Sequence, residues 1–298
     1  MSENNSNSGP VVLIGAGFAG LTAALALSRS KNRPPIILIE PKTRFVFLPL
    51  LYELLSREVM EWEIAPSYQS LLADRGIVLI KGYVERINTQ KQTVITSSGE
   101  EINYAQALIC TGSKPNDFGI AGLKEHALTF HGLKDVELLK QVIKTFKEVD
   151  QIGKSLVIVG AGSAGIELAC KLSDLLEKHT QICLIESARR VLPNGKSFNQ
   201  EQSERALKQR NIKIYLQTKV LSVTKSSVEL RSDINQSFNT FHLAHSGLIW
   251  TGGTTPVCPE LIPSISLNNG TIAINAYLQA NGLNNVFALG DLALNSDT

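Results

Sequence analysis

The sequence has 298 residues, of which 43% are hydrophobic and 19% are charged, and its formal net charge is +2. These values are typical of a globular protein of two ordinary domains, and they exclude a disordered or collagen-like chain. The near-neutral charge does not favour nucleic-acid binding, which normally requires a concentrated basic face, so we expect no nucleic-acid partner.

The first ten residues, MSENNSNSGP, are polar and contain neither a basic stretch nor an Arg-rich amphipathic pattern. They predict a disordered tail rather than a secretory or transit peptide. The four cysteines are far apart and show no C-x-x-C motif, and the five histidines form no ligand pattern. We therefore expect reduced thiols and no metal site.

Residues 11–28, VVLIGAGFAGLTAALALS, carry no charge and are just long enough to span a membrane. Residues 156–173, LVIVGAGSAGIELACKLS, repeat the same pattern, but with Glu167 and Lys171 inside the corresponding helix, where hydrocarbon would penalise them. The matching glycines are Gly15, Gly17 and Gly20 in the first copy and Gly160, Gly162 and Gly165 in the second. Both copies predict a strand, a glycine turn and a helix of a soluble fold.

Each copy continues into a second apolar strand that ends in an acid, Glu40 in IILIE and Glu186 in ICLIE. In this Rossmann fingerprint the first glycine permits a tight turn, the second lets a pyrophosphate approach the backbone, and the third lets helix and strand pack closely. The helix N-terminus attracts the phosphates, and the acid accepts hydrogen bonds from ribose hydroxyls. Two complete copies predict two dinucleotide sites.

Other elements repeat in the same order. Polar, β-branched stretches at residues 77–99 and 212–232 predict small β-meanders, and residues 133–146 show the apolar stripe of a helix. Apolar strands followed by Thr-Gly and proline occur in ALICTGSKP, residues 107–115, and in GLIWTGGTTP, residues 247–256. The chain ends in VFALGDLALNSDT, where a short apolar strand runs into Gly-Asp.

This order resembles the two-dinucleotide flavoprotein superfamily, in which the NAD(P)H domain is inserted into the FAD domain. The resemblance implies an α/β fold of two nested Rossmann-like domains, each with a parallel sheet and a small β-meander. We expect a tail at 1–10, a discontinuous FAD-binding domain at 11–118 and 246–298, and an NAD(P)H-binding domain at 119–245. The segment around 115–122 is the expected linker.

By this resemblance the two motifs and the Thr-Gly and Gly-Asp pairs supply the cofactor-binding residues. For FAD these are Gly15, Gly17, Phe18, Ala19, Gly20, Glu40, Pro41, Lys42, Pro49, Val84, Thr111, Gly112, Gly290 and Asp291. For NADPH or NADH they are Gly160, Gly162, Ser163, Ala164, Gly165, Glu186, Arg189, Arg190, Thr251 and Gly252. In the family the aspartate of the Gly-Asp pair contacts the ribityl and pyrophosphate region of FAD, and the same residue could also cap a following helix.

Residues 44–72, RFVFLPLLYELLSREVMEWEIAPSYQSLL, are the most specific stretch. They resemble type II NAD(P)H dehydrogenases, and especially the cyanobacterial and plastid branch of demethylphylloquinone or demethylnaphthoquinone reductases. In that family the backbone here runs beside the isoalloxazine ring, so Pro49 would wall the flavin. Read without the resemblance, the apolar residues of this stretch would most often be ordinary core.

The resemblance implies an FAD-dependent NAD(P)H:quinone oxidoreductase, in which hydride passes to the flavin and two electrons then pass to a quinone. Glu167 is the catalytic candidate, because a glutamate at this place lies beside the nicotinamide in the family; an exposed acid near a helix N-terminus is the alternative interpretation. No cysteine precedes Cys110, which disfavours disulfide and sulfide chemistry at the flavin. A non-enzymatic dinucleotide-binding module remains the rival hypothesis.

The preferred nicotinamide nucleotide is left open. Glu186 would repel a 2′-phosphate and favours NADH, whereas Arg189 and Arg190 could receive that phosphate. The resemblance to the cyanobacterial and plastid branch slightly favours NADPH.

Relatives continue past the Gly-Asp pair into segments that complete the FAD domain and contact the membrane. The resemblance thus implies a quinone substrate, a peripheral place on the cytoplasmic side of a thylakoid or plasma membrane for full-length relatives, and a C-terminally incomplete FAD domain here. On this basis we expect a truncated, soluble chain with weak flavin retention and little membrane association.

Overall fold

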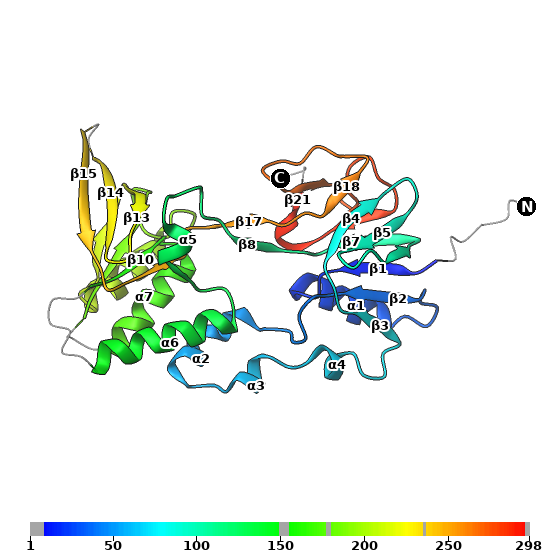
Figure 1. Ribbon diagram of the computed structural model, residues 1–298, viewed down its shortest axis with the longest axis horizontal. Helices are drawn as coiled ribbons and strands as arrows, with labels where there is room; N and C mark the ends of the chain where they lie inside the picture. Colours follow the sequence, from blue (N-terminus) through cyan, green and yellow to red (C-terminus); the bar gives the residue numbers. More distant parts are fainter. Residues whose placement is uncertain (1–8, 149–154, 177–179, 235–236, 296–298) are drawn as a thin grey trace, which may run out of the picture. The chain divides into compact units, whose positions relative to one another are not determined.

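The structure, a computed structural model, describes residues 9–148, 155–176, 180–234 and 237–295. It divides the chain into two units (Figure 1). The first unit contains the described residues of Met1–Val46, Trp62–Lys114 and Thr255–Thr298, and the second contains those of Phe47–Glu61 and Pro115–Thr254. Each unit contains one of the two glycine motifs.

The first unit is built on a five-stranded sheet in the order β20-β7-β1-β2-β3, in which all neighbours are parallel. Its strands are β1 (Val11–Ile14), β2 (Ile36–Ile39), β3 (Ile77–Ile80), β7 (Gln106–Ile109) and β20 (Val286–Ala288). The four residues of β1 are apolar and buried, as expected for a central strand that is covered on both faces.

Alternate residues of β1 enter two different cores. Val11 and Leu13 pack with the buried residues of α1 (Phe18–Ser28), which lies along the strands in Figure 1. Val12 and Ile14 pack on the opposite face with residues of an antiparallel layer. That layer contains β4 (Val84–Asn88), β5 (Thr93–Thr96) and β6 (Glu101–Asn103), with β18 (Glu260–Ile262) parallel to β4. The first unit is therefore a three-layer arrangement of helix, parallel sheet and antiparallel sheet.

The remaining elements of the first unit are short. They are α3 (Glu61–Ile64) at the boundary, α4 (Tyr68–Leu71), a parallel pair formed by β19 (Ile272–Ile274) and β21 (Ala293–Asn295), and the 3-10 turn η3 (Gly290–Leu292). Ser67 caps α4 by accepting a hydrogen bond from the Ser70 backbone N–H. This cap fixes the start of a helix whose first residue, Tyr68, is buried.

The second unit has a five-stranded parallel sheet in the order β12-β11-β10-β16-β9. Its strands are β9 (Leu128–Thr129), β10 (Ser155–Val159), β11 (Gln181–Ile185), β12 (Lys213–Tyr215) and β16 (Gly247–Trp250). Its helices are α5 (Leu123–His126), α6 (Leu133–Glu148), α7 (Ser163–Leu176) and α8 (Ser197–Gln209). An antiparallel sheet of β13 (Thr218–Val223), β14 (Ser227–Ile234) and β15 (Ser237–Ala244) shares a core with the parallel sheet. The two units thus repeat one plan, and the predicted α/β fold class is confirmed.

A segment from the first half of the sequence belongs to the second unit. Residues Phe47–Glu61 form the 3-10 turn η1 (Leu48–Leu50) and the helix α2 (Leu51–Ser56), which packs against α6 and α7. Leu51, Leu54 and Leu55 are buried in this contact. The apolar residues of this stretch that we considered as possible core are therefore partly core residues of the second unit.

The structure divides the chain at other positions than the sequence predicted. Residues 47–61 were expected in the FAD-binding domain at 11–118, but they pack on the second unit. The boundary at 246 also differs, because β16 pairs with β10 and completes the second parallel sheet. The unit boundary falls at Thr254, within β17 (Thr254–Pro256), which pairs with β8 (Ser113–Pro115) where the two connecting segments run together.

Two predicted meander strands lie elsewhere. β3 and β12 were assigned to the meanders, but each is an edge strand of its parallel sheet. An edge strand is partly exposed and so carries the mixed polarity that resembles a meander in sequence. The helix expected at 133–146 is α6, with buried Val136, Leu139, Ile143 and Phe146. Among the described helices, none combines the length and apolar character needed to cross a bilayer.

Candidate dinucleotide-binding sites

The first glycine motif connects β1 to α1, and its three glycines occupy different environments. Gly15 has φ +92°, and a Cβ built on it would lie 2.5 Å from the Cys110 carbonyl oxygen. A Cβ on Gly20 would lie 1.9 Å from the Gly15 carbonyl oxygen. Around Gly17, by contrast, no described atom would lie within 4 Å of such a Cβ. Space at the N-terminus of α1 is therefore left open only beside the second glycine.

The second motif, between β10 and α7, repeats this arrangement. Gly160 has φ +102°, with the Thr251 carbonyl oxygen 2.7 Å from a built Cβ, and a Cβ on Gly165 would lie 1.8 Å from the Gly160 carbonyl oxygen. Gly162 again faces open space, with no described atom within 4 Å. Two turns with the same single opening at a helix N-terminus are suited to two pyrophosphates, which need close approach to backbone N–H groups.

The acids at the ends of β2 and β11 are buried and held in place by backbone N–H groups. Glu40 accepts hydrogen bonds from the backbone N–H groups of Ala16 (2.7 Å) and Lys42 (2.9 Å). Glu186 accepts the equivalent bonds from Ala161 (2.7 Å) and Ala188 (2.8 Å). These donors compensate the burial of each carboxylate and tie it to its glycine loop. Since a carboxylate oxygen accepts more than one hydrogen bond, capacity remains for ribose hydroxyls.

Several predicted residues of the first unit gather at the carboxyl ends of its strands. A Cβ on Gly290 would lie 3.3 Å from the Ala19 Cβ, so the Gly-Asp pair lies against the first turn of α1. Asp291 is exposed, and its Oδ2 accepts a hydrogen bond of 2.6 Å from the Ser113 hydroxyl. The Thr111 hydroxyl donates to the Val257 carbonyl, and the Gly112 carbonyl accepts from the Val257 backbone N–H at 2.9 Å.

The other candidates of the first unit surround this edge. Phe18 is 44% exposed, and its ring meets Phe45 edge-on at 5.0 Å. Val84 begins β4 and follows Gly82, whose backbone N–H donates to the Glu40 carbonyl at 3.3 Å. Pro41 and Lys42 directly follow Glu40 in the chain.

Pro49 is placed differently from the expectation. It lies in η1, within the second unit rather than the first. The reason is that η1 directly precedes α2 in the chain, and α2 packs on α6 and α7. The structure therefore does not group Pro49 with the Gly15 motif in one compact unit. Its role as a wall of the flavin stays a prediction.

In the second unit, Thr251 lies against the first residues of the glycine motif. Its hydroxyl donates towards the Val159 carbonyl at 2.9 Å and the Gly160 carbonyl at 3.0 Å, and Gly252 follows it at the end of β16. Ser163 and Ala164 form the first turn of α7, and Glu167 is exposed one turn later. The candidate catalytic carboxylate is thus available to a ligand bound at this helix N-terminus.

The two arginines after Glu186 differ in their contacts. Arg190 makes an ion pair with Glu204 of α8, with its Nε at 3.1 Å and its Nη2 at 3.0 Å from the same carboxylate oxygen. Arg189 is exposed to solvent beside it. Arg189 is therefore the cation that could receive a 2′-phosphate without first breaking the Arg190–Glu204 pair.

Comparisons with known proteins agree with this geometry. Residues 9–298 match the family described as pyridine nucleotide-disulphide oxidoreductase. The chain belongs to this family. It is 34% identical to the demethylphylloquinone reductase NdbB of Synechocystis over 96% of its own length and 72% of that protein. It is 30% identical to the alternative NAD(P)H-ubiquinone oxidoreductase C1 of Arabidopsis thaliana, covering 94% of this chain and 60% of that one.

A solved structure of NDH2 from Plasmodium falciparum in complex with NADH superposes with a TM-score of 0.82 at 20% identity, over 96% of this chain and 64% of that chain. This likeness supports the fold alone. The chain spans about three fifths of the Arabidopsis relative and slightly under two thirds of the Plasmodium protein. The expected relationship to type II NAD(P)H dehydrogenases is confirmed.

Cysteine chemistry is the reaction that the family's description would suggest. All four cysteines lie in the described part of the chain, and all are free thiols. Burial raises the pKa of Cys110 to about 12 and that of Cys258 to about 11. A thiol must ionise to attack a disulfide, so these two cysteines are poor nucleophiles near neutral pH. The chain has the fold of this family without an activated cysteine pair.

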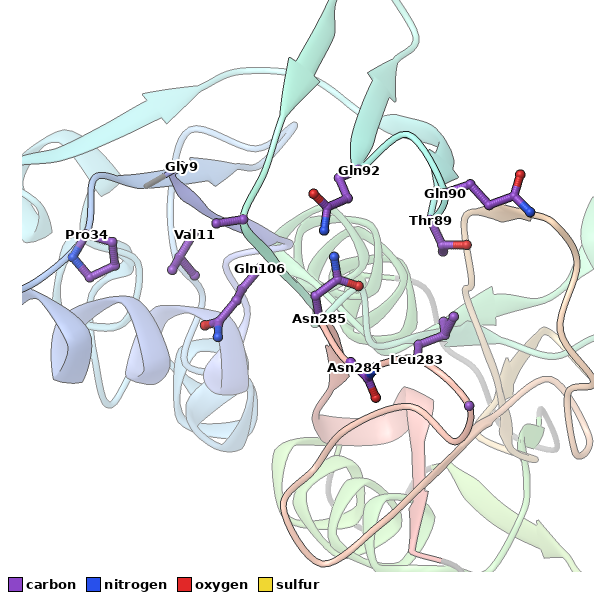
Figure 2. Close-up of a pocket in the computed structure, with 12 residues that line it drawn as sticks. Gly9, Val11, Pro34, Thr89, Gln90, Gln92, Gln106, Leu283, Asn284 and Asn285 are labelled. Carbon is purple, nitrogen blue, oxygen red and sulfur yellow. The ribbon is translucent and has the colours of Figure 1, made fainter. Parts of the chain in front are cut away.

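A cavity of about 640 Å³ opens at the amino ends of the strands of the first parallel sheet, opposite the ends that carry the glycine motif (Figure 2). Val11, Gln106 and Asn285, which line it, lie at the amino ends of β1, β7 and β20. Its lining contains no charged side chain. Ligands of open parallel sheets bind at the carboxyl ends of the strands, so this cavity is not the dinucleotide site.

Sequence reasoning missed two tyrosines that contact the motifs of this family member. The Tyr68 hydroxyl donates to the Ala16 carbonyl at 2.8 Å, and the Tyr52 hydroxyl lies 3.4 Å from the Ala164 carbonyl. Burial, followed by the charge of Glu40, raises the pKa of Tyr68, so it is a neutral donor. Neither tyrosine belongs to a motif, and only the Ser67 cap before Tyr68 gave a local signal of a fixed helix start.

Proposed function

We propose that the chain is an FAD-dependent NAD(P)H:quinone oxidoreductase, with FAD at the Gly15 motif and the nicotinamide nucleotide at the Gly160 motif. The observation that carries this proposal is the repeated opening beside Gly17 and Gly162, each with a buried acid tied to the same loop. A chain with two such openings is suited to two dinucleotides. Family membership and the names of the relatives support FAD, NAD(P)H and a quinone as the reactants.

FAD fits the first motif because no described side chain obstructs the second glycine, and because FAD has no 2′-phosphate that Glu40 would repel. The residues that would hold it are Gly15, Gly17, Phe18, Ala19, Gly20, Glu40, Pro41, Lys42, Val84, Thr111, Gly112, Gly290 and Asp291, with Pro49 as the proposed wall of the ring. When bound, the flavin accepts a hydride and passes two electrons to the acceptor. The chain's own work is to bind and orient: α1 presents backbone N–H groups to phosphate, and Glu40 accepts from ribose.

The nicotinamide nucleotide fits the second motif in the same way. Gly162 admits the pyrophosphate, Glu186 accepts from the ribose, and Glu167 is the proposed carboxylate beside the nicotinamide. We propose that both NADH and NADPH are accepted, with Arg189 supporting the 2′-phosphate of NADPH. The free guanidinium of Arg189 offsets the repulsion between that phosphate and Glu186.

The names of the relatives support a proposal for the electron acceptor and for the cellular location. The Synechocystis relative is named for demethylphylloquinone and the Arabidopsis relative for ubiquinone. At 34% against 30% identity, the first supports a naphthoquinone-type acceptor for this chain. Because such quinones reside in membranes, we propose a peripheral place on the cytoplasmic side of a membrane for the full-length relatives of this chain.

The test is an anaerobic reduction. The chain is loaded with FAD, mixed with NADH or NADPH without oxygen, and followed at the flavin absorption band; a soluble naphthoquinone is then added. Bleaching followed by recovery of the band is the expected result. Nucleotide binding without bleaching would instead indicate a non-enzymatic dinucleotide-binding module.

A further inference from the structure

The residue between the first two glycines of the first motif is held at both of its backbone groups. The Ala16 N–H donates to the Glu40 carboxylate at 2.7 Å, and the Ala16 carbonyl accepts from the Tyr68 hydroxyl at 2.8 Å. Ala16 is fully buried and Tyr68 is 2% exposed, so both bonds are shielded from water. Hydrogen bonds in such surroundings are stronger than in water, and they fix the loop on both sides of this residue.

The second motif holds the same carbonyl with a different donor. Ala161, which corresponds to Ala16, donates its N–H to Glu186 at 2.7 Å and accepts at its carbonyl from the backbone N–H of Leu192 at 2.7 Å. Leu192 has φ +50°, a conformation that is uncommon for residues other than glycine. A side-chain hydroxyl in one motif and a backbone N–H in the other thus bind equivalent carbonyls. Two unrelated donors at one position indicate a requirement of the loop itself.

The bond to the Ala16 carbonyl also sets the direction of the next N–H group. The Ala16–Gly17 peptide is trans, so its carbonyl and the Gly17 N–H point in opposite directions within one plane. A hydroxyl bound to the carbonyl therefore directs the Gly17 N–H away from Tyr68. Gly17 is exposed, and its N–H has no hydrogen-bond partner within the described part of the chain. It is a free donor at the start of α1, where phosphate oxygens bind.

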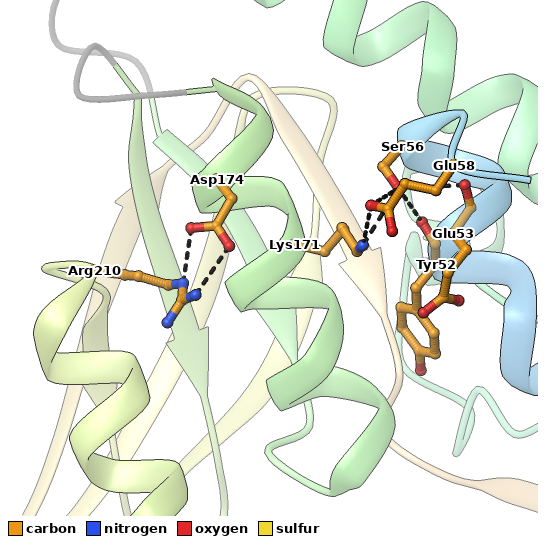
Figure 3. Close-up of polar contacts among 7 residues, drawn as sticks. All are labelled: Tyr52, Glu53, Ser56, Glu58, Lys171, Asp174 and Arg210. Atoms are coloured by element: carbon orange, nitrogen blue, oxygen red, sulfur yellow. Dashed lines mark hydrogen bonds and ion pairs between the residues drawn. The ribbon is translucent and has the colours of Figure 1, made fainter.

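The part of the chain that carries Tyr68 is anchored within the first unit. The Tyr68 backbone N–H donates to the Thr43 carbonyl at 3.1 Å, and the Ser67 cap fixes the start of α4. The preceding helix α2 is held separately, within the second unit, by the ion pair between Glu58 and Lys171 at 2.8 Å (Figure 3). The position of the Tyr68 hydroxyl is therefore set by contacts in the same unit as the first glycine motif.

We propose that Tyr68 is a positioning residue of the FAD site, which holds the Ala16–Gly17 peptide so that the Gly17 N–H is free to bind the pyrophosphate. This inference rests on the proposed function, since it takes FAD as the ligand of the first motif. The ring of Tyr68 packs in a core with Leu21 and Leu72, and a phenylalanine ring would fill that place equally well. The hydroxyl is the group that meets the glycine loop.

The experiment measures FAD affinity by flavin fluorescence, and stability by urea unfolding without FAD. Tyr68→Phe keeps the ring and removes only the hydroxyl. We expect FAD to bind about 5-fold more weakly, the effect of one ordinary hydrogen bond, where parent and variant are both folded. The matched control is Tyr104→Phe, in the same unit, because Tyr104 is 3% exposed and its hydroxyl has no hydrogen-bond partner among the described residues. This control should bind FAD like the parent.

A second background separates positioning from folding. Gly17→Ala places a methyl group in the space that the pyrophosphate needs, where no described atom now lies within 4 Å of a built Cβ. In this background the loss of the Tyr68 hydroxyl should weaken FAD binding by much less than about 5-fold, because the group that it positions is no longer used. The fall in urea midpoint caused by Tyr68→Phe should be the same in both backgrounds, since it does not involve the ligand.

The outcomes distinguish this inference from the proposed function. Equal FAD binding by the parent and Tyr68→Phe, with or without a fall in urea midpoint, would overturn the inference and leave the proposed function intact. An equal fold-loss in the parent and Gly17→Ala backgrounds would also overturn it. A parent that binds NADH but no FAD would overturn the proposed function instead, and with it the role of Tyr68 in an FAD site.

Discussion

Gly162 and Gly165 of the second motif, three residues apart, should differ in how an added methyl group changes the free energy of unfolding. At Gly162 a Cβ meets no described atom within 4 Å, and the backbone does not have the positive φ that disfavours alanine. Gly162→Ala should therefore change the free energy of unfolding by less than about 0.5 kcal/mol. At Gly165 the Cβ would lie 1.8 Å from the Gly160 carbonyl oxygen and 2.7 Å from the Thr251 hydroxyl oxygen. Gly165→Ala must displace backbone, which costs about 1–3 kcal/mol or more.

In the Gly162→Ala variant, the affinity for the nucleotide should fall although the free energy of unfolding hardly changes. The methyl group would occupy the opening through which the pyrophosphate reaches the backbone N–H groups at the start of α7. Losing one charge-assisted hydrogen bond there costs about 1.5–3 kcal/mol, which weakens NADH binding about 10- to 150-fold. Gly165→Ala should instead lose stability first, and binding only as a consequence.

The assay is urea unfolding of both variants without nucleotide, together with calorimetric titration of NADH at a temperature where each is folded. A stable Gly162→Ala variant that binds NADH as tightly as the parent would show that no pyrophosphate approaches this glycine. A Gly162→Ala variant as unstable as Gly165→Ala would show that the opening beside Gly162 does not exist.

Two further predictions concern charge. Arg189→Ala should lower kcat/KM for NADPH about 10-fold and leave that for NADH nearly unchanged, because only NADPH carries the phosphate that this guanidinium would bind; equal losses for both nucleotides in a steady-state assay would contradict this. Burial lowers the pKa of His245 from its ordinary 6.5. As the pH falls, this histidine therefore takes up a proton in the unfolded chain before it does so in the folded chain. The free energy of unfolding should then fall as the pH drops below about 6.5, by up to about 1.4 kcal/mol per pH unit. Urea unfolding at pH 7.5 and 5.5 should show a smaller acid loss for His245→Gln, and an unchanged loss would contradict the prediction.

The features that the sequence predicted well are those governed by local geometry. The spacing of Gly15, Gly17 and Gly20 implies one turn, one opening and one close helix–strand contact, and the structure shows these three environments. The acids were equally predictable, since Glu40 ends an apolar strand that must lie beside β1. That both carboxylates bind the backbone of their own glycine loops, at Ala16 and Ala161, was not readable from spacing alone.

Features that depend on tertiary packing were not predictable. Nothing in residues 47–61 indicates that α2 leaves the first unit, because its apolar face could pack on any helix. Tyr52 was consequently missed, as was the approach of its hydroxyl to the Ala164 carbonyl. β3 and β12 were placed in the meanders because an edge strand and a meander strand share the same mixed polarity. The assignment of Pro49 to the flavin wall remains a prediction from resemblance.

The most direct measurement is the crystal structure of the chain grown with FAD and NADH together. The account predicts FAD with its pyrophosphate at Gly17 and its adenine ribose at Glu40, and NADH with its pyrophosphate at Gly162 and its adenine ribose at Glu186. Electron density for the two cofactors in exchanged motifs, or a dinucleotide at neither opening, would contradict the account.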